Sequence, residues 1–251
     1  MININRNPTP PASLQNSEIQ QYIADIASYK DLSSDEQAVT AKPKCSASYR
    51  NADIFEAFDK DFFAKCYLTE KKAFANSYAF DIEHFKAKAI SQSPELTYEW
   101  ANLYPADHVA NMLKPRIDPS EGYLDPCEPS DDVEKEILYT VMFGGECHFE
   151  ALDSSNKKAL NTAELLELIH NGHDKNSKQK TANLRAEINE RRNRILELIL
   201  EWLGASKENN IQKEFELRTK LKKYLSRKSS FTMLMRSMSA VRNHIPTEML
   251  D

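Results

Sequence analysis

Five polar residues, in three short groups, carry the side-chain types that hydrolysis of a phosphodiester needs. Glu83 and His84 are adjacent, Asn102 follows, and Asn111 and Lys114 come last. A histidine is the natural general base near neutral pH. A carboxylate and an amide oxygen are hard ligands that suit Mg²⁺ or Mn²⁺, and a lysine offsets the charge that builds up on a phosphorane.

Each group by itself is common in proteins. A Glu-His pair is usually an ordinary surface pair, and Trp100, just before Asn102, most often belongs to a hydrophobic core. The order and spacing of the three groups together are the stronger signal. They indicate a hydrolase that uses a divalent cation.

The composition excludes several other classes of protein. Hydrophobic residues make up 41% and charged residues 28% of the 251 residues, which is typical of a globular protein without membrane spans. No apolar run approaches twenty residues, and Met1 to Ser13 lack an apolar signal core, so we expect a cytoplasmic protein. The four cysteines form no CxxC pair and are expected to be reduced thiols.

The chain contains neither GxxxxGK[ST] nor GxGxxG, so nucleotide hydrolysis, if it is involved, is expected from another chain. The net charge of −5 does not suggest a general polyanion binder. From Lys213 to Arg242, however, nine residues are basic and two are acidic. This segment could contact phosphate groups or could be a solvated helix face.

The candidate residues are expected on a strand–loop–strand–helix unit. Tyr78 to Phe80 is predicted to be a short strand that continues into residues 81–85, and Pro94 breaks the chain. Asn102 to Tyr104 then leads into a helix that carries Asp107, Asn111 and Lys114.

The flanking segments are expected to be mostly helical. Residues 1–45 are predicted to be a flexible, partner-docking arm with one helix at Ser17–Tyr29. Residues 46–160 form a core with a flanking loop and hairpin, and residues 161–251 a helical C-terminal region. In the core we expect a helix at Asp53–Lys65, a Pro-rich loop at 115–129, and strands at Ile137–Phe143 and Cys147–Phe149 joined by a glycine turn.

Four helices are expected in the C-terminal region. The first is capped by Thr162 and ends near Asn171-Gly172, and the second spans Ala182–Leu203 and is closed by Gly204. The third spans Glu208–Tyr224, with Ile211, Phe215 and Leu221 on one stripe, and the last is a Met-rich helix at Ser230–Val241.

Other chemically suggestive residues are given ordinary interpretations. His170 and His173 are expected at the surface, beside a turn, because no third ligand is evident. Cys147-His148 lacks an activating context for a protease dyad. The acidic residues between Glu128 and Glu134 are expected to be the charged start of a helix.

The sequence resembles a known family. Residues 81–88 resemble the family string DIEHFxPK, Leu96 to Leu103 resemble L-x-x-x-W-x-N-L, and residues 111–114 match N-x-x-K. Ile117-Asp118-Pro119 resembles the acidic-Pro pair that follows. These strings are typical of HNH nucleases of the Septu antiviral type (PtuB), which also accompany some retrons, and the resemblance covers about residues 65 to 185.

The resemblance implies a role for each candidate residue. His84 would be the general base, Glu83 and Asn111 the ligands of Mg²⁺ or Mn²⁺, Asn102 the brace of the loop that carries His84, and Lys114 a contact to phosphate. The implied fold is α+β, a small ββα-metal (HNH) core with a helical N-terminal segment and a helical C-terminal part. The implied partners are an ABC/SMC-like ATPase (PtuA-like), a DNA or RNA substrate, including transfer RNA, and a retron reverse transcriptase with its msDNA.

Two departures from the family pattern affect these expectations. The family often carries two CxxC pairs that bind a structural zinc, but here the first pair is Cys66 and Thr69 and the second falls at Asp107 and Ala110. Structural zinc usually has four N or S ligands, so we expect no such zinc; a degenerate site of Cys66, Asp107 and His108 is the alternative. Ala87 also replaces a family proline.

Two rival functions remain open at this stage. The chain could be an interaction subunit with a vestigial nuclease core, which the lost cysteines favour and the intact catalytic set opposes. It could also be a restriction-type nuclease that acts without a partner. The substitution His84→Ala separates the first rival from an active nuclease.

Overall fold

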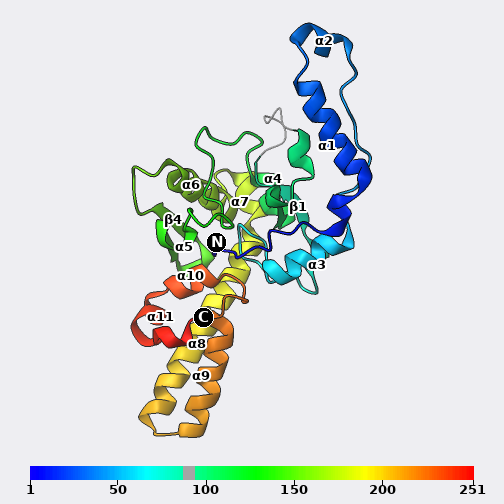
Figure 1. Ribbon diagram of the computed structural model, residues 1–251. Helices are drawn as coiled ribbons and strands as arrows, with labels where there is room; N and C mark the ends of the chain where they lie inside the picture. Colours follow the sequence, from blue (N-terminus) through cyan, green and yellow to red (C-terminus); the bar gives the residue numbers. More distant parts are fainter. Residues whose placement is uncertain (87–93) are drawn as a thin grey trace.

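Helices form most of the chain, and two small antiparallel sheets lie among them, so the fold is α+β (Figure 1). This computed structural model describes residues 1–86 and 94–251. In the N-terminal half, the elements are η1 (Ala12–Gln15), α1 (Ser17–Lys30), α2 (Ser34–Val39), α3 (Ala52–Asp61), η2 (Ser77–Ala79), β1 (Asp81–His84), η3 (Pro94–Thr97), η4 (Trp100–Asn102), β2 (Leu103–Ala106) and α4 (His108–Leu113). In the C-terminal half, they are α5 (Val133–Glu136), β3 (Ile137–Val141), η5 (Phe143–Gly145), β4 (Cys147–Ala151), α6 (Lys157–Asn171), α7 (Lys175–Lys180), α8 (Ala182–Lys207), α9 (Ile211–Leu225), α10 (Thr232–Ser237), α11 (Ser239–His244) and η6 (Thr247–Met249).

The first sheet has the strand–strand–helix order that the sequence predicts. β1 pairs with β2 in antiparallel register, with Asp81 opposite Ala106 and His84 opposite Leu103. Asp107 caps α4 by accepting a hydrogen bond from the Val109 N–H at 3.0 Å. The predicted strand at Tyr78–Phe80 is wrong, because the Asn76 side chain accepts from the Tyr78 N–H and starts the 3₁₀ turn η2 there.

Aromatic side chains from α3 fill the space behind this sheet. The rings of Phe58 and Trp100 stack with centroids 5.4 Å apart, and Phe62 meets Tyr104 edge-to-face at 5.6 Å. The predicted helix to Lys65 ends earlier, at Asp61, because Phe63 and the following alanine have φ angles of 58° and 55° and leave the helical region.

The second sheet is the predicted hairpin of β3 and β4. Its turn has Gly144 and Gly145 at φ angles of 85° and 81°, the left-handed region that favours glycine. A Cβ on Gly145 would lie 1.9 Å from the backbone oxygen of Arg185 in α8, so the close approach of the turn to α8 also requires glycine. α6 packs on β4 and also contacts α4, which places this hairpin and α6 beside the first sheet.

Several predicted bounds in the C-terminal half are wrong for local reasons. α6 starts at Lys157, where the Asn156 side chain caps it; the Thr162 hydroxyl lies inside the helix and donates to the Lys158 carbonyl. α8 continues through Gly204 to Lys207. The predicted Met-rich helix is two helices, α10 and α11, because Met238 has extended backbone angles.

The α8–α9 hairpin projects from the rest of the molecule (Figure 1). Of the predicted apolar stripe on α9, Leu221 is buried, but Ile211 and Phe215 are exposed. Within the described residues, no helix combines the length and apolar character required to cross a bilayer.

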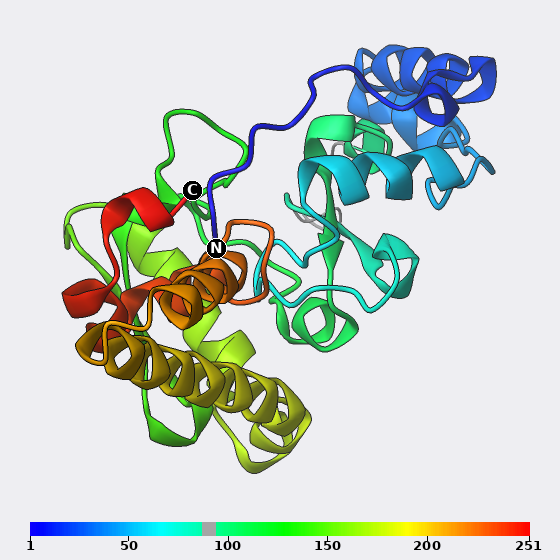
Figure 2. The ribbon, with the colours of Figure 1, turned by 90° about the horizontal axis from the view of Figure 1, so that it is seen from below.

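The start of the chain is not the flexible arm that we predicted. Met1, Ile2 and Ile4 are buried, and the Ile4 N–H donates to the Pro126 carbonyl at 2.7 Å. From there the N-terminal segment crosses the molecule to α1 (Figure 2). The predicted helix at Ser17–Tyr29 is confirmed as α1.

A buried carboxylate joins three distant segments of the chain. Glu70 contacts the Met1 ammonium and the Lys65 ammonium at 3.2 Å each, and accepts from the N–H groups of Thr232 and Met233. Burial alone would raise the pKa of Glu70, but the two positive charges and the N–H donors outweigh it and lower the pKa to about 2. The C-terminal helices are thus tied to the turn at residues 65–72.

We expect Glu70→Gln to lower the free energy of unfolding by roughly 3–5 kcal/mol, because it leaves the Lys65 ammonium buried without a counter-charge. Since the pKa of Glu70 falls from 4.5 to about 2 on folding, its contribution is present above pH 4.5 and is lost as the pH falls from there towards 2. Urea unfolding at several pH values measures both effects. The exposed Glu150→Gln is the control, and equal stability of the two variants would contradict the expectation.

His170 is buried, so its predicted place at the surface is wrong. Its Nδ1 lies 2.8 Å from the Leu166 carbonyl, and its ring contacts Phe149 with centroids 4.7 Å apart. Burial lowers the pKa of His170 from 6.5 to about 4. The folded protein therefore keeps this ring neutral at pH values where the unfolded chain protonates it.

We expect the free energy of unfolding to fall by about 3 kcal/mol on account of His170 as the pH drops from about 6.5 to about 4. The variant His170→Phe keeps the ring shape and has no proton to bind, so its stability should depend less on pH in this range. Urea unfolding at several pH values tests this, and parallel curves for the two proteins would refute it.

Candidate active site

Lys114 connects the end of α4 to the end of β1. Its ammonium donates to the Glu83 carboxylate at 2.8 Å and to the backbone carbonyls of His84 and Phe85 at 3.1 and 2.8 Å. The Asp118 carboxylate lies 3.9 Å away, and the Lys114 side chain is 2% exposed. This geometry gives Lys114 a positioning role, which differs from the contact to phosphate that we expected.

Asn102 links Lys86 to Leu96, which lie on either side of residues 87–93, the part of the chain outside the described residues. Its Oδ1 accepts from the Lys86 N–H at 2.7 Å, and its Nδ2 donates to the carbonyls of Lys86 and Leu96 at 3.3 and 3.2 Å. Because Lys86 follows His84 by two positions, these bonds fix the path of the chain directly after β1. The family positions Ala87 and Lys88 lie outside the described residues.

His84 lies against a backbone carbonyl. Its Nε2 is 3.1 Å from the Thr97 oxygen, and its ring meets Tyr49 edge-to-face with centroids 5.2 Å apart. A carbonyl can only accept, so Nε2 carries the proton in the neutral ring and the basic lone pair lies on Nδ1. The residue is buried, with a relative exposure of 5%.

Asn111 lies beside Asp81. Asp81 precedes Glu83 by two residues on β1, so these two side chains lie on the same side of the strand. Its Nδ2 donates to Asp81 Oδ2 at 3.0 Å, and His108 Nδ1 lies 2.8 Å from the same oxygen. Burial would raise the pKa of Asp81, but these two hydrogen bonds outweigh it and lower the pKa. The predicted ligands Glu83 and Asn111 are therefore near each other but have different partners.

The sequence analysis assigned no role to Asp81, and it placed His108 only in the alternative degenerate zinc site with Cys66 and Asp107. The spacing of these residues was a usable signal, because alternate residues of a strand share a face and so do residues three apart on a helix. Asp81 with Glu83 on β1, and His108 with Asn111 on α4, follow those two periods.

The oxygens of Asp81, Glu83 and Asn111 are the donor types that Mg²⁺ and Mn²⁺ bind. Asn111 would present its Oδ1 to a cation by rotating its amide, since O and N exchange places in that rotation. In the part of the chain that the structure describes, no group of three or more His, Cys, Asp or Glu side chains has an arrangement that could hold a metal ion as it stands. The residues fit a cation in type, and binding would require side-chain rotation.

The four positions where the family has zinc cysteines lie in one buried region. The Cys66 thiol accepts from the Thr69 N–H at 3.4 Å and from the backbone of Asp107. Burial raises the pKa of Cys66, and these hydrogen bonds only partly offset it. Thr69 and Ala110 are buried as well, and hydrogen bonds to a neutral thiol join the turn at residues 65–72 to the start of α4.

The residues set aside earlier do not form a second site. Burial raises the pKa of Cys147 to about 12, so its thiol is a poor nucleophile at neutral pH. His148 points to Glu167, with Nδ1 2.7 Å from the carboxylate. Asp132 caps the short helix α5, so the acidic residues do begin a helix, and Asp131 pairs with Lys158 at 3.0 Å.

Comparison of the chain with protein-family models, with curated proteins and with solved structures finds no match in any of the three.

We expect Lys114→Met to lower the free energy of unfolding by about 1–3 kcal/mol, because the carbonyls of His84 and Phe85 and the Glu83 carboxylate lose their donor. Lys135 makes a comparable but exposed ion pair with Asp132 at 2.9 Å, so Lys135→Met should cost much less stability than Lys114→Met. Urea unfolding of both variants measures the difference. Equal losses would show that Lys114 does not hold β1 to α4.

Proposed function

We propose that this chain is a metal-dependent endonuclease of the HNH type that hydrolyses phosphodiester bonds in nucleic acid. The observation that supports it most is the join between α4 and β1. Lys114 at the end of α4 holds Glu83 and the carbonyl of His84, while Asn102 holds the chain directly after β1. Four residues of the family pattern, Glu83, His84, Asn102 and Lys114, are thus linked at the end of β1, and Asn111 is linked to the start of β1 through Asp81.

In this proposal, His84 is the general base. Its Nδ1 takes a proton from the attacking water, and the Thr97 carbonyl keeps the ring in the tautomer that makes Nδ1 basic. Glu83 and Asn111, with Asp81 beside them, provide the oxygen ligands. A divalent cation bound there would neutralise charge on the phosphate and on the leaving oxygen. Lys114 and Asn102 position the base and the ligands.

We propose further that the enzyme is the effector subunit of an antiphage complex of the Septu type, with a PtuA-like ATPase as its partner and DNA or RNA as its substrate. The support is the sequence resemblance, the absence of a phosphate-binding loop motif in the chain, and the turn at Cys66. Hydrogen bonds to the Cys66 thiol join three of the four positions where the family has zinc cysteines, Cys66, Thr69 and Asp107.

A second candidate is a catalytically weak interaction subunit with the same core. One observation favours it: Glu83, the expected ligand, is already paired with the ammonium of Lys114 at 2.8 Å. A cation would have to compete with that ion pair for the carboxylate. The two candidates differ in whether His84 matters for cleavage.

We expect wild-type protein with Mg²⁺ or Mn²⁺ to cleave end-labelled DNA or total RNA, alone or with its co-purified ATPase, and EDTA to abolish cleavage. His84→Ala should lower the rate by roughly 10²–10⁴-fold, the usual contribution of a general base. The control is His148→Ala. His148 is an exposed histidine whose Nδ1 is hydrogen-bonded to the Glu167 carboxylate. Thermal melting confirms that both variants are folded.

Three outcomes decide between the candidates. Loss of cleavage in His84→Ala but not in His148→Ala supports the nuclease, and the polymer that is cut identifies the substrate class. Cleavage that survives His84→Ala shows that the activity does not use this site. An absence of cleavage by wild type with partner, ATP and cation favours the interaction subunit.

A further inference from the structure

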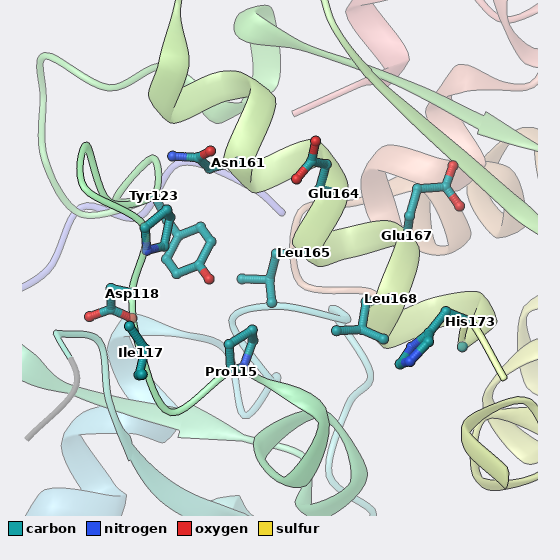
Figure 3. Close-up of a pocket in the computed structure, with 12 residues that line it drawn as sticks. Pro115, Ile117, Asp118, Tyr123, Asn161, Glu164, Leu165, Glu167, Leu168 and His173 are labelled. Carbon is teal, nitrogen blue, oxygen red and sulfur yellow. The ribbon is translucent and has the colours of Figure 1, made fainter. Parts of the chain in front are cut away.

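A groove between α6 and the loop after α4 is lined mainly by apolar side chains. Pro115, Ile117 and Tyr123 from the loop face Leu165 and Leu168 of α6 across a hollow of about 610 Å³ (Figure 3). This volume could hold several side chains. Ile117 is 67% exposed, so this apolar side chain is open to a partner at the edge of the hollow.

The margin of the groove is acidic. Asp118 and Glu164 lie at its edges (Figure 3), and none of the described residues that line it is Lys or Arg. Burial raises the pKa of Tyr123 to about 12, and the charges of Asp118 and Glu164 add to this. The loop continues this character, because residues 117–134 contain seven acidic side chains and no basic one.

The outer face of α9 has the opposite character. Ile211 and Phe215 are 79% and 68% exposed, and Arg218 and Lys222 follow them at helical spacing along the same face. Among the described residues, Arg218 makes a long ion pair, 3.8 Å, with the exposed Glu248. This α9 face is thus an apolar pair of side chains followed by cations, whereas the groove is an apolar hollow beside carboxylates.

We propose that the α9 face of one molecule docks into the α6 groove of a second copy of this chain. A single molecule cannot make the contact within itself, because the tip of the α8–α9 hairpin projects to the end of the molecule remote from α6 (Figure 1). Phe215 and Ile211 enter the hollow, and Arg218 and Lys222 meet Asp118 and Glu164. The contact does not depend on the proposed nuclease activity.

In the proposed contact one α9 face meets one groove, so the pair is head-to-tail and keeps a free groove on one molecule and a free α9 face on the other. Such contacts extend into rings or open chains of molecules. One helix face in one groove buries less area than a typical stable interface, so we expect micromolar association that strengthens with concentration.

Head-to-tail docking has a test that a symmetric dimer would fail. Phe215→Asp disables the α9 face and Ile117→Asp disables the groove, and both residues are exposed, so neither change should prevent folding. Each variant alone should associate about thirtyfold or more weakly than wild type, as for loss of a central interface residue. An equal mixture of the two should form a complex of two chains and nothing larger, because one intact α9 face and one intact groove remain.

The charges provide an independent arm of the test. Lys222→Glu and Glu164→Lys should each weaken association, and the mixture of the two variants should recover it, because one intact α9 face and one intact groove remain and the two reversed charges also face one another. The control is Phe143→Asp, which changes an aromatic residue that is 84% exposed and outside both surfaces. Sedimentation velocity over a wide range of protein concentration measures all of these samples, and circular dichroism verifies folding.

Wild-type protein that remains monomeric at the highest concentrations would overturn the proposal, and the groove would then serve a different ligand. Association that is unaffected by Phe215→Asp and Ile117→Asp would also overturn it. So would a mixture of these two variants that behaves like the separate samples.

Discussion

The buried carboxylate of Glu70 is the interaction on which the arrangement of the molecule depends. An ionised side chain without water is stable only when charges and donors replace its hydration. For Glu70 these come from residue 1, from Lys65 and from the start of α10, segments that are far apart in the sequence. The Lys65 ammonium also donates to the Arg227 carbonyl at 2.7 Å. The turn at residues 65–72 therefore cannot move without the C-terminal helices.

The same turn supports the candidate site from its other side. The Tyr67 N–H donates to the Pro105 carbonyl in β2 at 2.9 Å, and the Cys66 thiol contacts the backbone of Asp107 where α4 begins. A rigid position for α4 matters because Lys114, at its end, sets the position of Glu83 and His84. Binding and catalytic side chains need support of this kind to hold a productive geometry. In this chain, hydrogen bonds provide this support.

The sequence predicted the parts of the fold that follow from local patterns. The strand–strand–helix order, the glycine hairpin, α1 and the end of α6 at Gly172 all rest on periodicity or on turn residues. The errors arise where tertiary structure decides. Phe63 takes a positive φ to let the chain turn at the end of α3, Met238 leaves the helix between α10 and α11, and His170 is buried under the hairpin.

The candidate site shows the same division. The types of residue at positions 83, 84, 102, 111 and 114 could be read from the sequence, but their partners could not. The direction of a lysine side chain depends on which oxygens lie nearby, and for Lys114 two of the three acceptors are backbone carbonyls that no sequence pattern reveals.

The ion pair between Lys114 and Glu83 has a physical consequence for the proposed activity. A partly buried carboxylate needs a positive charge beside it, and either an ammonium or a divalent cation can provide that charge. If Glu83 binds a cation, part of its interaction with Lys114 must be exchanged for that ion. Lys114 would then hold the carboxylate in place until the cation arrives, so the positioning of the site and its metal affinity would be set by the same side chain.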